Sequence, residues 1–137
     1  MKKISLIALL FVLLLASACG TDGESETESG KATVVSITAE EAKAKLDSDD
    51  SVILVDVRTP EEYREGHIPG AILLPVSDIE AKAESELQDK SATYIVYCRS
   101  GSRSAAAASQ LVEMGYENIY DLGGINDWPY EKVTGDE

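Results

Sequence analysis

The chain has 137 residues, and 25 acidic against 12 basic side chains give it a formal net charge of −13 at pH 7. A chain this acidic repels both nucleic acid and anionic lipid head groups, so neither is expected as a direct partner. Residues 34–137, about 100 residues, suffice for one hydrophobic core and are too few for a second domain.

Residues 1–18 are predicted to be a signal peptide. Lys2 and Lys3 form a charged start, and the apolar stretch 4–15 is too short to span a bilayer comfortably. The following Leu15-Ala16-Ser17-Ala18-Cys19 resembles the lipobox of bacterial lipoproteins, although alanine stands at position 16 where leucine is usual. This resemblance implies that Cys19 carries lipid such as palmitate. The alternative is an ordinary secretory signal cut after the Ala-Ser-Ala sequence, with a free cysteine.

Residues 19–33 are predicted to form an acidic tether that begins at the lipidated cysteine. After Cys19 the segment is made of small and polar residues with no large apolar side chain, which is typical of a flexible linker. Lipid on Cys19, at ~0.8 kcal/mol per buried CH₂ group, would anchor the protein to a bacterial membrane on its extracytoplasmic side. Cys98 would then be the sole thiol, with no partner for an intramolecular disulfide.

Residues 34–137 alternate between strand and helix patterns. Short apolar runs predict strands at 34–37, 52–57, 71–74, 94–97 and 118–120. The run at 52–57 is apolar on both faces until its acidic residue, as in a central parallel strand. The alternation predicts an α/β fold with a small, mainly parallel sheet flanked by helices, in one domain.

Helix boundaries are marked by capping residues. Three Ser/Thr-x-x-Glu capping boxes predict where the first three helices begin: Thr38 with Glu41, Thr59 with Glu62, and Ser77 with Glu80. Pro60 is well suited to the first position of the second helix. An alanine-rich helix follows residue 103, and Gly115 is placed to end it.

The segment Cys98-Arg99-Ser100-Gly101-Ser102-Arg103 carries the strongest functional signal. It joins a buried strand to the alanine-rich helix, so the cysteine is expected over a helix N-terminus, where free N–H groups attract anions. The segment holds two of the chain's four arginines, and no Asp or Glu occurs from Lys90 to Val112. These features favour a reactive thiolate. The alternative is a buried structural cysteine, for which such a polar segment is a poor lining.

Four segments of the domain form a wider pattern, in the order 56–58, 62–71, 98–104 and 123–128. They read Asp-Val-Arg, Glu-Tyr-Arg-Glu-Gly-His-Ile-Pro-Gly-Ala, Cys-Arg-Ser-Gly-Ser-Arg-Ser and Gly-Gly-Ile-Asn-Asp-Trp. Together they resemble the rhodanese family, and above all its single-domain thiosulfate sulfurtransferases. The resemblance implies a rhodanese-like fold, with Cys98 as the catalytic nucleophile and residues Arg99, Ser100, Gly101, Ser102 and Arg103 as the substrate-binding cradle.

The resemblance also implies a reaction. Rhodaneses move a sulfane sulfur from thiosulfate or a similar small donor to a thiol or cyanide acceptor, through a cysteine persulfide. The turn from Cys98 to Arg103 is suited to this chemistry, because N–H groups at a helix N-terminus stabilise an anionic sulfur. Neither a metal nor an organic cofactor is expected, and the protein is expected to be a monomer. The alternative is a membrane-tethered persulfide carrier or thiol sensor with little turnover.

A cysteine phosphatase or arsenate reductase is a second enzymatic alternative. Such phosphatases place five residues between their cysteine and arginine, whereas four lie between Cys98 and Arg103. The shorter loop suits a single sulfur atom and crowds a phosphate. An acidic residue that would protonate a leaving alkoxide is also missing from the loop, so this alternative is disfavoured.

Three further polar residues are predicted to be structural, close to the site. Asp56 and Arg58 end a buried strand, and an ion pair between Arg58 and Glu62 is expected to pin the second helix. His67, the only histidine, lies in a turn between glycine and proline, where packing or hydrogen bonding is the expected role rather than general base catalysis. Trp128 is expected to fill the core.

Overall fold

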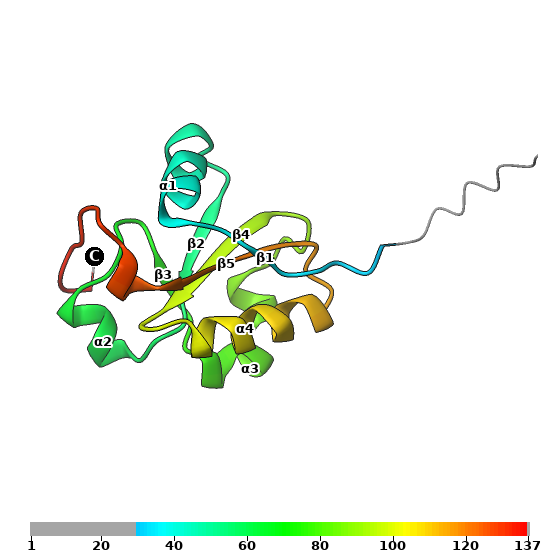
Figure 1. The fold of residues 1–137 in the computed structure, drawn as a ribbon. Coiled ribbons are helices and arrows are strands. Elements are labelled where there is room, and N and C mark those ends of the chain that lie inside the picture. Colours follow the sequence, from blue (N-terminus) through cyan, green and yellow to red (C-terminus); the bar gives the residue numbers. More distant parts are fainter. Residues whose placement is uncertain (1–29, 137) are drawn as a thin grey trace, which may run out of the picture. The chain divides into compact units, whose positions relative to one another are not determined.

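A five-stranded parallel sheet forms the centre of the computed structural model, which describes residues 30–136 (Figure 1). The strands lie in the order β1-β5-β4-β2-β3, and each neighbouring pair is parallel. Their bounds are β1 Val35–Ser36, β2 Ile53–Asp56, β3 Ile72–Leu73, β4 Thr93–Cys98 and β5 Asn118–Gly124. The predicted α/β fold with a parallel sheet is therefore confirmed.

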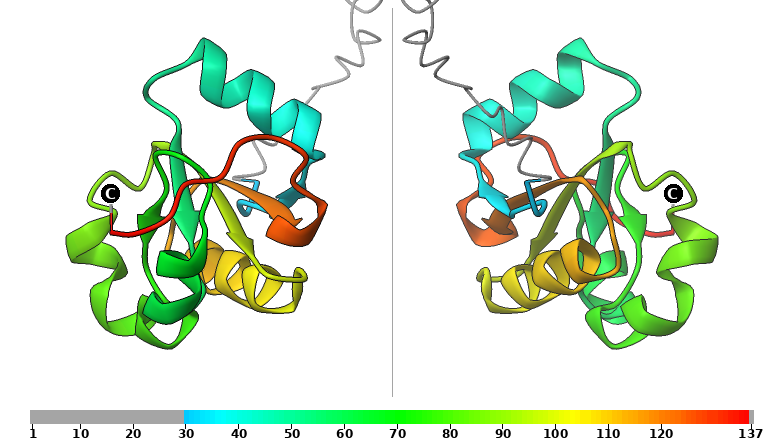
Figure 2. Two further views of the ribbon diagram at one scale, coloured as in Figure 1. Left: turned by 90° about the vertical axis from the view of Figure 1, so that its left-hand side faces the viewer. Right: turned by 90° about the vertical axis from the view of Figure 1, so that its right-hand side faces the viewer.

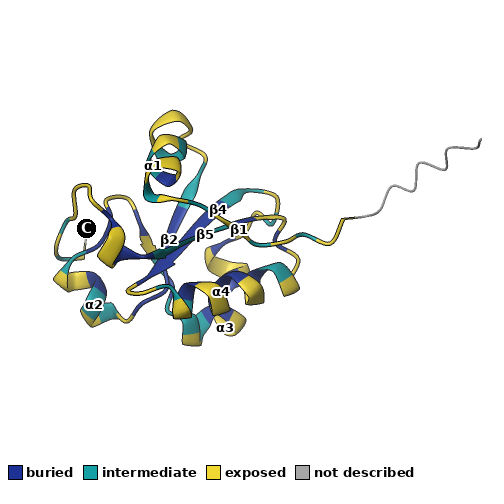
Figure 3. Ribbon diagram, in the orientation of Figure 1, coloured by how far each residue is buried: buried dark blue, intermediate teal, exposed yellow. Residues whose placement is uncertain are grey.

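Helices cover both faces of the sheet (Figures 1 and 2). Helix α1, Ala39–Ser48, lies on one face, and helices α3, Ile79–Glu86, and α4, Ser102–Glu113, lie on the other. Helix α2, Pro60–Glu65, follows β2 and packs a tyrosine into the core on the α1 side. Figure 3 shows the buried residues gathered along the central strands, with the outer faces of the helices exposed.

The first two predicted capping boxes are present. At the start of α1 the Thr38 hydroxyl accepts a hydrogen bond from the Glu41 N–H, and the Glu41 carboxylate accepts one from the Thr38 N–H. Thr59 and Glu62 make the same pair of bonds at the start of α2, where proline occupies the first turn. These reciprocal bonds satisfy N–H groups that have no partner inside the helix.

The third predicted cap is wrong. Ser77 lies inside a short 3₁₀ turn, Val76–Asp78, and its hydroxyl donates to the Asp78 carboxylate rather than to the helix start. The turn forms because the Asp78 N–H donates to the carbonyl of Pro75 at 2.8 Å. A residue in such a turn does not have the extended backbone that an N-cap requires.

Strand β5 is longer than the sequence predicts and contains an irregularity. It continues through Gly124, and its register against β4 shifts because Val96 pairs with Asp121 whereas Tyr97 pairs with Gly123. Leu122 is thus an extra residue on β5. Such a bulge redirects the side chains that follow, and bulges occur often beside active sites.

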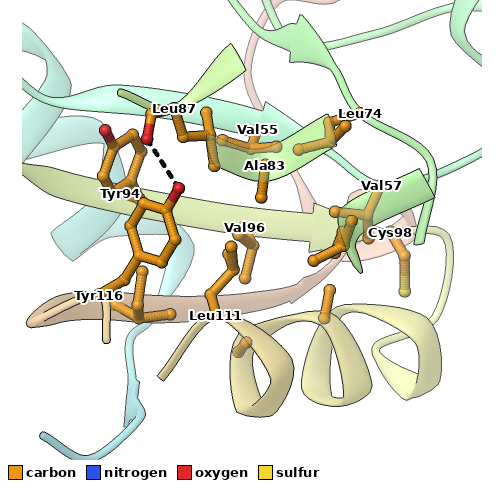
Figure 4. Close-up of a cluster of buried hydrophobic side chains, with 14 residues drawn as sticks. Val55, Val57, Leu74, Ala83, Leu87, Tyr94, Val96, Cys98, Leu111 and Tyr116 are labelled. Carbon is orange, nitrogen blue, oxygen red and sulfur yellow. Dashed lines mark hydrogen bonds between the residues drawn. The ribbon is translucent and has the colours of Figure 1, made fainter. Parts of the chain in front are cut away.

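The hydrophobic cluster between the sheet and helices α3 and α4 ends at the predicted catalytic cysteine. Its members come from β2, β4 and β5, from both helices and from connecting loops, and Cys98 is 0 % exposed among them. Figure 4 shows Cys98 at one end of this cluster and Tyr94 and Tyr116 at the other. The Tyr116 hydroxyl donates to the carbonyl of Leu87 at 2.7 Å, so this buried polar group is paired.

Some predictions concern residues before the described part of the chain. The signal peptide, Cys19 and most of the tether lie outside residues 30–136. Within the described residues, no helix is long and apolar enough to cross a membrane.

Candidate active site

Cys98 ends strand β4 and faces the first turn of helix α4. The loop 99–101 reverses the chain direction, and Gly101 has φ +108°, a left-handed conformation that a residue with a side chain adopts only with strain. This conformation aims the Gly101 N–H at the Cys98 sulfur, at 3.0 Å from nitrogen to sulfur. The predicted position of the cysteine over a helix N-terminus is confirmed.

The sulfur lies in a ring of hydrogen-bond donors. Burial alone would raise the pKa of the Cys98 thiol, but hydrogen bonds outweigh it and leave the pKa below its usual value. The donors are the N–H groups of Ser104, Gly101 and Ser100 and the hydroxyl of Ser104. Donors fixed around the sulfur favour the thiolate, as the sequence predicts.

Cys98 is buried despite the polar composition of the loop that follows it. Cys98 belongs to the same hydrophobic cluster as Val57 and Ala107, and its side chain is closed off from solvent. The reason is that the loop curls back over the end of β4, with the donors on one side of the sulfur and apolar residues on the other.

Glu62 of helix α2 binds both arginines of the loop. Its carboxylate accepts two hydrogen bonds from the Arg103 guanidinium, at 2.7 and 2.9 Å, and one from Arg99 Nε at 3.0 Å. The bonds from Arg103 hold the pKa of the Glu62 carboxyl well below its usual range, and the same contact raises the pKa of Arg103. The loop is therefore less positive than its own residues suggest.

This arrangement corrects the predicted ion pair between Arg58 and Glu62. Arg58 instead turns inward and pairs with Asp56, with Nη2 to Oδ2 at 2.7 Å, and it also donates to the carbonyl of Gly66. Both partners are buried. Hydrogen bonds to Asp56 outweigh the effect of burial and raise the pKa of Arg58. Glu62 is thus left free to bind the catalytic loop.

Residues at the end of β5 and just after it support the loop. The Asn126 N–H donates to the carbonyl of Arg99 at 3.3 Å. A Cβ atom at Gly124 would lie 2.4 Å from that carbonyl oxygen and 2.9 Å from the Cα of Ser100. Only glycine allows the loop backbone to approach this closely, so position 124 fixes where the donors around Cys98 stand.

His67 and Trp128 are both buried. His67 is 0 % exposed, stacks on the Tyr63 ring at 3.6 Å between centroids, and its Nδ1 lies 2.9 Å from the Tyr63 carbonyl oxygen. Trp128 is buried in the cluster on the α1 face. Within residues 30–136, no group of three or more His, Cys, Asp or Glu side chains is placed to hold a metal ion.

Three residues of the site are not predicted from the sequence to be part of it. Ser104 is the last residue of the loop motif, and hydrogen bonds from its N–H and hydroxyl lower the pKa of Cys98. Glu62 was assigned to a cap, which it makes while its other bonds go to the arginines. Asp121 lies on β5 and accepts a hydrogen bond from Ser104, and no local pattern in the sequence pointed to it.

Residues 38–131, more than half of the chain, match the family model described as the rhodanese-like domain. The chain is 38 % identical over 81 residues to the thiosulfate sulfurtransferase PspE of Escherichia coli K12, a match covering 59 % of this chain and 78 % of that protein. It is 36 % identical over 107 residues to a candidate sulfur carrier protein, YrkF, of Bacillus subtilis. That match covers 77 % of this chain but only 56 % of the carrier protein's own length.

A solved structure shares both fold and sequence. The crystal structure of a rhodanese-like domain protein from Staphylococcus aureus superimposes with a TM-score of 0.65 at 34 % identity. The superposition covers 74 % of this chain and 99 % of that one.

Proposed function

The chain belongs to the rhodanese-like domain family, and on this premise we propose that it is a sulfurtransferase that works through a Cys98 persulfide. In this proposal a sulfane sulfur passes from thiosulfate, or a similar small donor, to a thiophilic acceptor. The single observation that carries it is the ring of N–H and hydroxyl donors around the Cys98 sulfur at the start of α4.

The first half of the proposed reaction charges the enzyme. The Cys98 thiolate attacks the outer sulfur of thiosulfate, an S–S bond forms to the enzyme, and sulfite leaves with the electron pair of the broken S–S bond. The product is a persulfide whose terminal sulfur is anionic. The terminal sulfur would be bonded to the Cys98 sulfur, so the N–H groups of the loop would be close enough to stabilise its charge.

The second half regenerates the thiolate. A thiol or cyanide acceptor attacks the terminal sulfur, and Cys98 leaves as a thiolate that the same donors stabilise. The Gly101 N–H lies 3.0 Å from the cysteine sulfur itself, and only four residues separate Cys98 from Arg103. A loop this short supports transfer of one sulfur atom rather than chemistry on a phosphate.

The two loop arginines are proposed to draw the anionic donor toward the site. Arg99 is 53 % exposed and Arg103 is 34 % exposed, so both guanidinium groups are accessible while they bind Glu62. Two arginines against one carboxylate leave a net positive charge at the entrance. Because Cys98 is closed off, the donor's approach requires these side chains or the loop to move aside.

A steady-state assay of sulfur transfer from thiosulfate to cyanide tests the proposal. The parent protein should turn over many times per Cys98, and Cys98→Ser should be inactive while keeping its fold by circular dichroism. Absence of turnover in the parent with thiosulfate and with other sulfane donors would overturn it.

A persulfide carrier is the second candidate, favoured by the similarity to the candidate sulfur carrier protein of Bacillus subtilis. A carrier would use the same cradle around Cys98 but would load one sulfur and then wait for a partner. The same assay separates the two functions, because a carrier gives a single burst of one sulfur per cysteine and a catalyst continues.

The location of the protein is also a proposal. We propose that Cys19 carries lipid and holds the domain outside the cytoplasm, with residues 20–33 as the tether. Support comes from the sequence before Cys19 alone, and this residue lies outside the described part of the chain.

A further inference from the structure

The Ser104 hydroxyl has more acceptors than protons. Ser104 is 0 % exposed, and its Oγ lies 2.7 Å from Asp121 Oδ1, 3.0 Å from the Gly101 carbonyl oxygen and 3.4 Å from the Gly123 carbonyl oxygen. A hydrogen bond from the same hydroxyl is among the causes that lower the pKa of the Cys98 thiol. A hydroxyl has one proton to donate, so these acceptors compete for it.

Asp121 is the strongest of these competitors. It offers the shortest of the three oxygen contacts, and a bond to an ionised carboxylate is stronger than one to a neutral carbonyl. With the proton directed to Asp121, only the lone pairs of Ser104 remain for the thiol. Donation from the hydroxyl to a thiolate therefore requires that the proton first leave Asp121.

The fold holds Asp121 in this position. Its backbone pairs with Val96 on β4, and its side chain reaches the α4 face of the sheet, where Cys98 and Ser104 also lie. The bulge at the next residue lets the Gly123 N–H donate to the same carboxylate oxygen, at 2.9 Å. Two donors therefore fix the direction of this oxygen.

We propose that Asp121 is a positioning residue that controls the Ser104 hydroxyl and thereby how readily Cys98 ionises. In the resting thiol, Ser104 donates to Asp121. When the sulfur becomes a thiolate or persulfide, the hydroxyl rotates to donate to the sulfur, and Asp121 keeps only the bond from Gly123. This inference rests on the proposed function, in which the cysteine must ionise to react.

Other charges act on the same cysteine and must be separated from this effect. Arg103 on α4 interacts with the charges of Glu62 from α2, of Cys98, and of Asp56 at the end of β2. Asp121 also acts on the sulfur directly through its own charge. Replacing Asp121 therefore has two effects on the ionisation of Cys98. Only the effect transmitted through the hydroxyl depends on Ser104.

A double-mutant cycle isolates the effect of Asp121 that is transmitted through the Ser104 hydroxyl. The variants are Asp121→Asn, Ser104→Ala and the two combined, with Asp127→Asn, an exposed site just after β5, and Ser109→Ala, an exposed site on α4, as matched controls. The readout is the pH midpoint of Cys98 alkylation by iodoacetamide, followed on the cysteine peptide by mass spectrometry so that Cys19 does not contribute. Thermal unfolding of each variant establishes that it is folded.

Asp121→Asn should lower the midpoint by about half a pH unit or more, because an amide oxygen competes less for the Ser104 proton. Ser104→Ala should raise the midpoint, and in that background Asp121→Asn should lower it by much less. Ser104→Thr keeps a hydroxyl at this position, so in that background Asp121→Asn should again lower the midpoint by the full amount. Both controls should match the parent.

Two results would overturn the inference. An equal shift with and without Ser104 would mean that Asp121 acts through its charge alone, and an unchanged or higher midpoint in Asp121→Asn would mean that it does not hold the proton. Alkylation needs no sulfur donor, so the midpoints can be measured whether or not the protein transfers sulfur. Failure of sulfur transfer would contradict the proposed function but not the role of Asp121.

Discussion

Glu62 and Arg103 are 41 residues apart in the chain, and the carboxylate of one accepts both terminal N–H groups of the other, at 2.7 and 2.9 Å. The contact ties helix α2 to the first turn of α4. The glutamate side chain is only 17 % exposed, so solvent weakens this pair less than an ordinary surface pair. It therefore links the loop around Cys98 to helix α2.

Replacing Glu62 by Gln should reduce the acid sensitivity of folding. The pKa of Glu62 is lower in the folded than in the unfolded chain, so its stabilisation is present above the unfolded value of about 4.3 and is lost as pH falls toward the folded value. Glu62→Gln should therefore lose about 1 kcal/mol of stability at neutral pH and less at pH 3. Urea unfolding at both pH values measures this.

Glu61→Gln is the matched control for that measurement, because Glu61 is the exposed neighbour on the same helix. It should leave the pH dependence as in the parent. Equal losses for Glu62→Gln at pH 7 and pH 3 would mean that the ionised carboxylate is not what stabilises the loop.

Gly124→Ala should displace the catalytic loop. The added methyl group would lie 2.4 Å from the Arg99 carbonyl oxygen. The backbone can relieve this clash only by moving, which should reduce the free energy of unfolding by about 1–3 kcal/mol. The N–H groups around Cys98 would move with the loop, so the alkylation midpoint should rise and sulfur transfer should fall. Gly66→Ala, where a Cβ meets nothing within 4 Å, is the control and should be close to the parent. Normal activity in Gly124→Ala would contradict the supporting role of this position.

Asp56→Asn should be among the most destabilising single changes near the site. Arg58 is 4 % exposed and Asp56 is fully buried, so the substitution leaves a buried guanidinium without its counter-ion. A loss of about 3–5 kcal/mol is expected from breaking one side of such a pair. Urea unfolding compares it with Asp50→Asn, an exposed carboxylate that should change stability little. A similar small loss for both would show that the pair does not hold this end of β2.

The sequence predicts the strands, two of the three caps and the place of Cys98 because these depend on neighbours a few residues apart. Hydrophobic runs mark β2 and β4, and the capping boxes of Thr38 and Thr59 are local pairs. The loop glycine at 101 is also local, since its left-handed conformation is set by the turn itself.

The parts that could not be predicted depend on side chains brought together by the fold. The absence of acids between residues 90 and 112 suggested a strongly positive loop, yet Glu62 reaches it from α2. Asp121 reaches Ser104 because of where β5 lies and how it bulges. The burial of Cys98 likewise follows from loop closure, which the polar composition of the segment concealed.

Cys19→Ala should release the protein from membranes or block its processing. If lipid on Cys19 is the anchor, the parent should partition with the membrane fraction, and any processed variant should be soluble outside the cytoplasm. Cell fractionation and detergent phase partitioning measure this, with Cys98→Ser as a control that should stay with the membrane. A parent protein already free of the membrane would contradict the anchor.

The most direct test of the central claim is the intact mass of the protein after treatment with thiosulfate. The parent should gain the mass of one sulfur atom, and cyanide or dithiothreitol should remove it. Cys98→Ser should gain nothing. No added sulfur in the parent, or an adduct that persists in Cys98→Ser, would contradict the account of Cys98 as the sulfur acceptor.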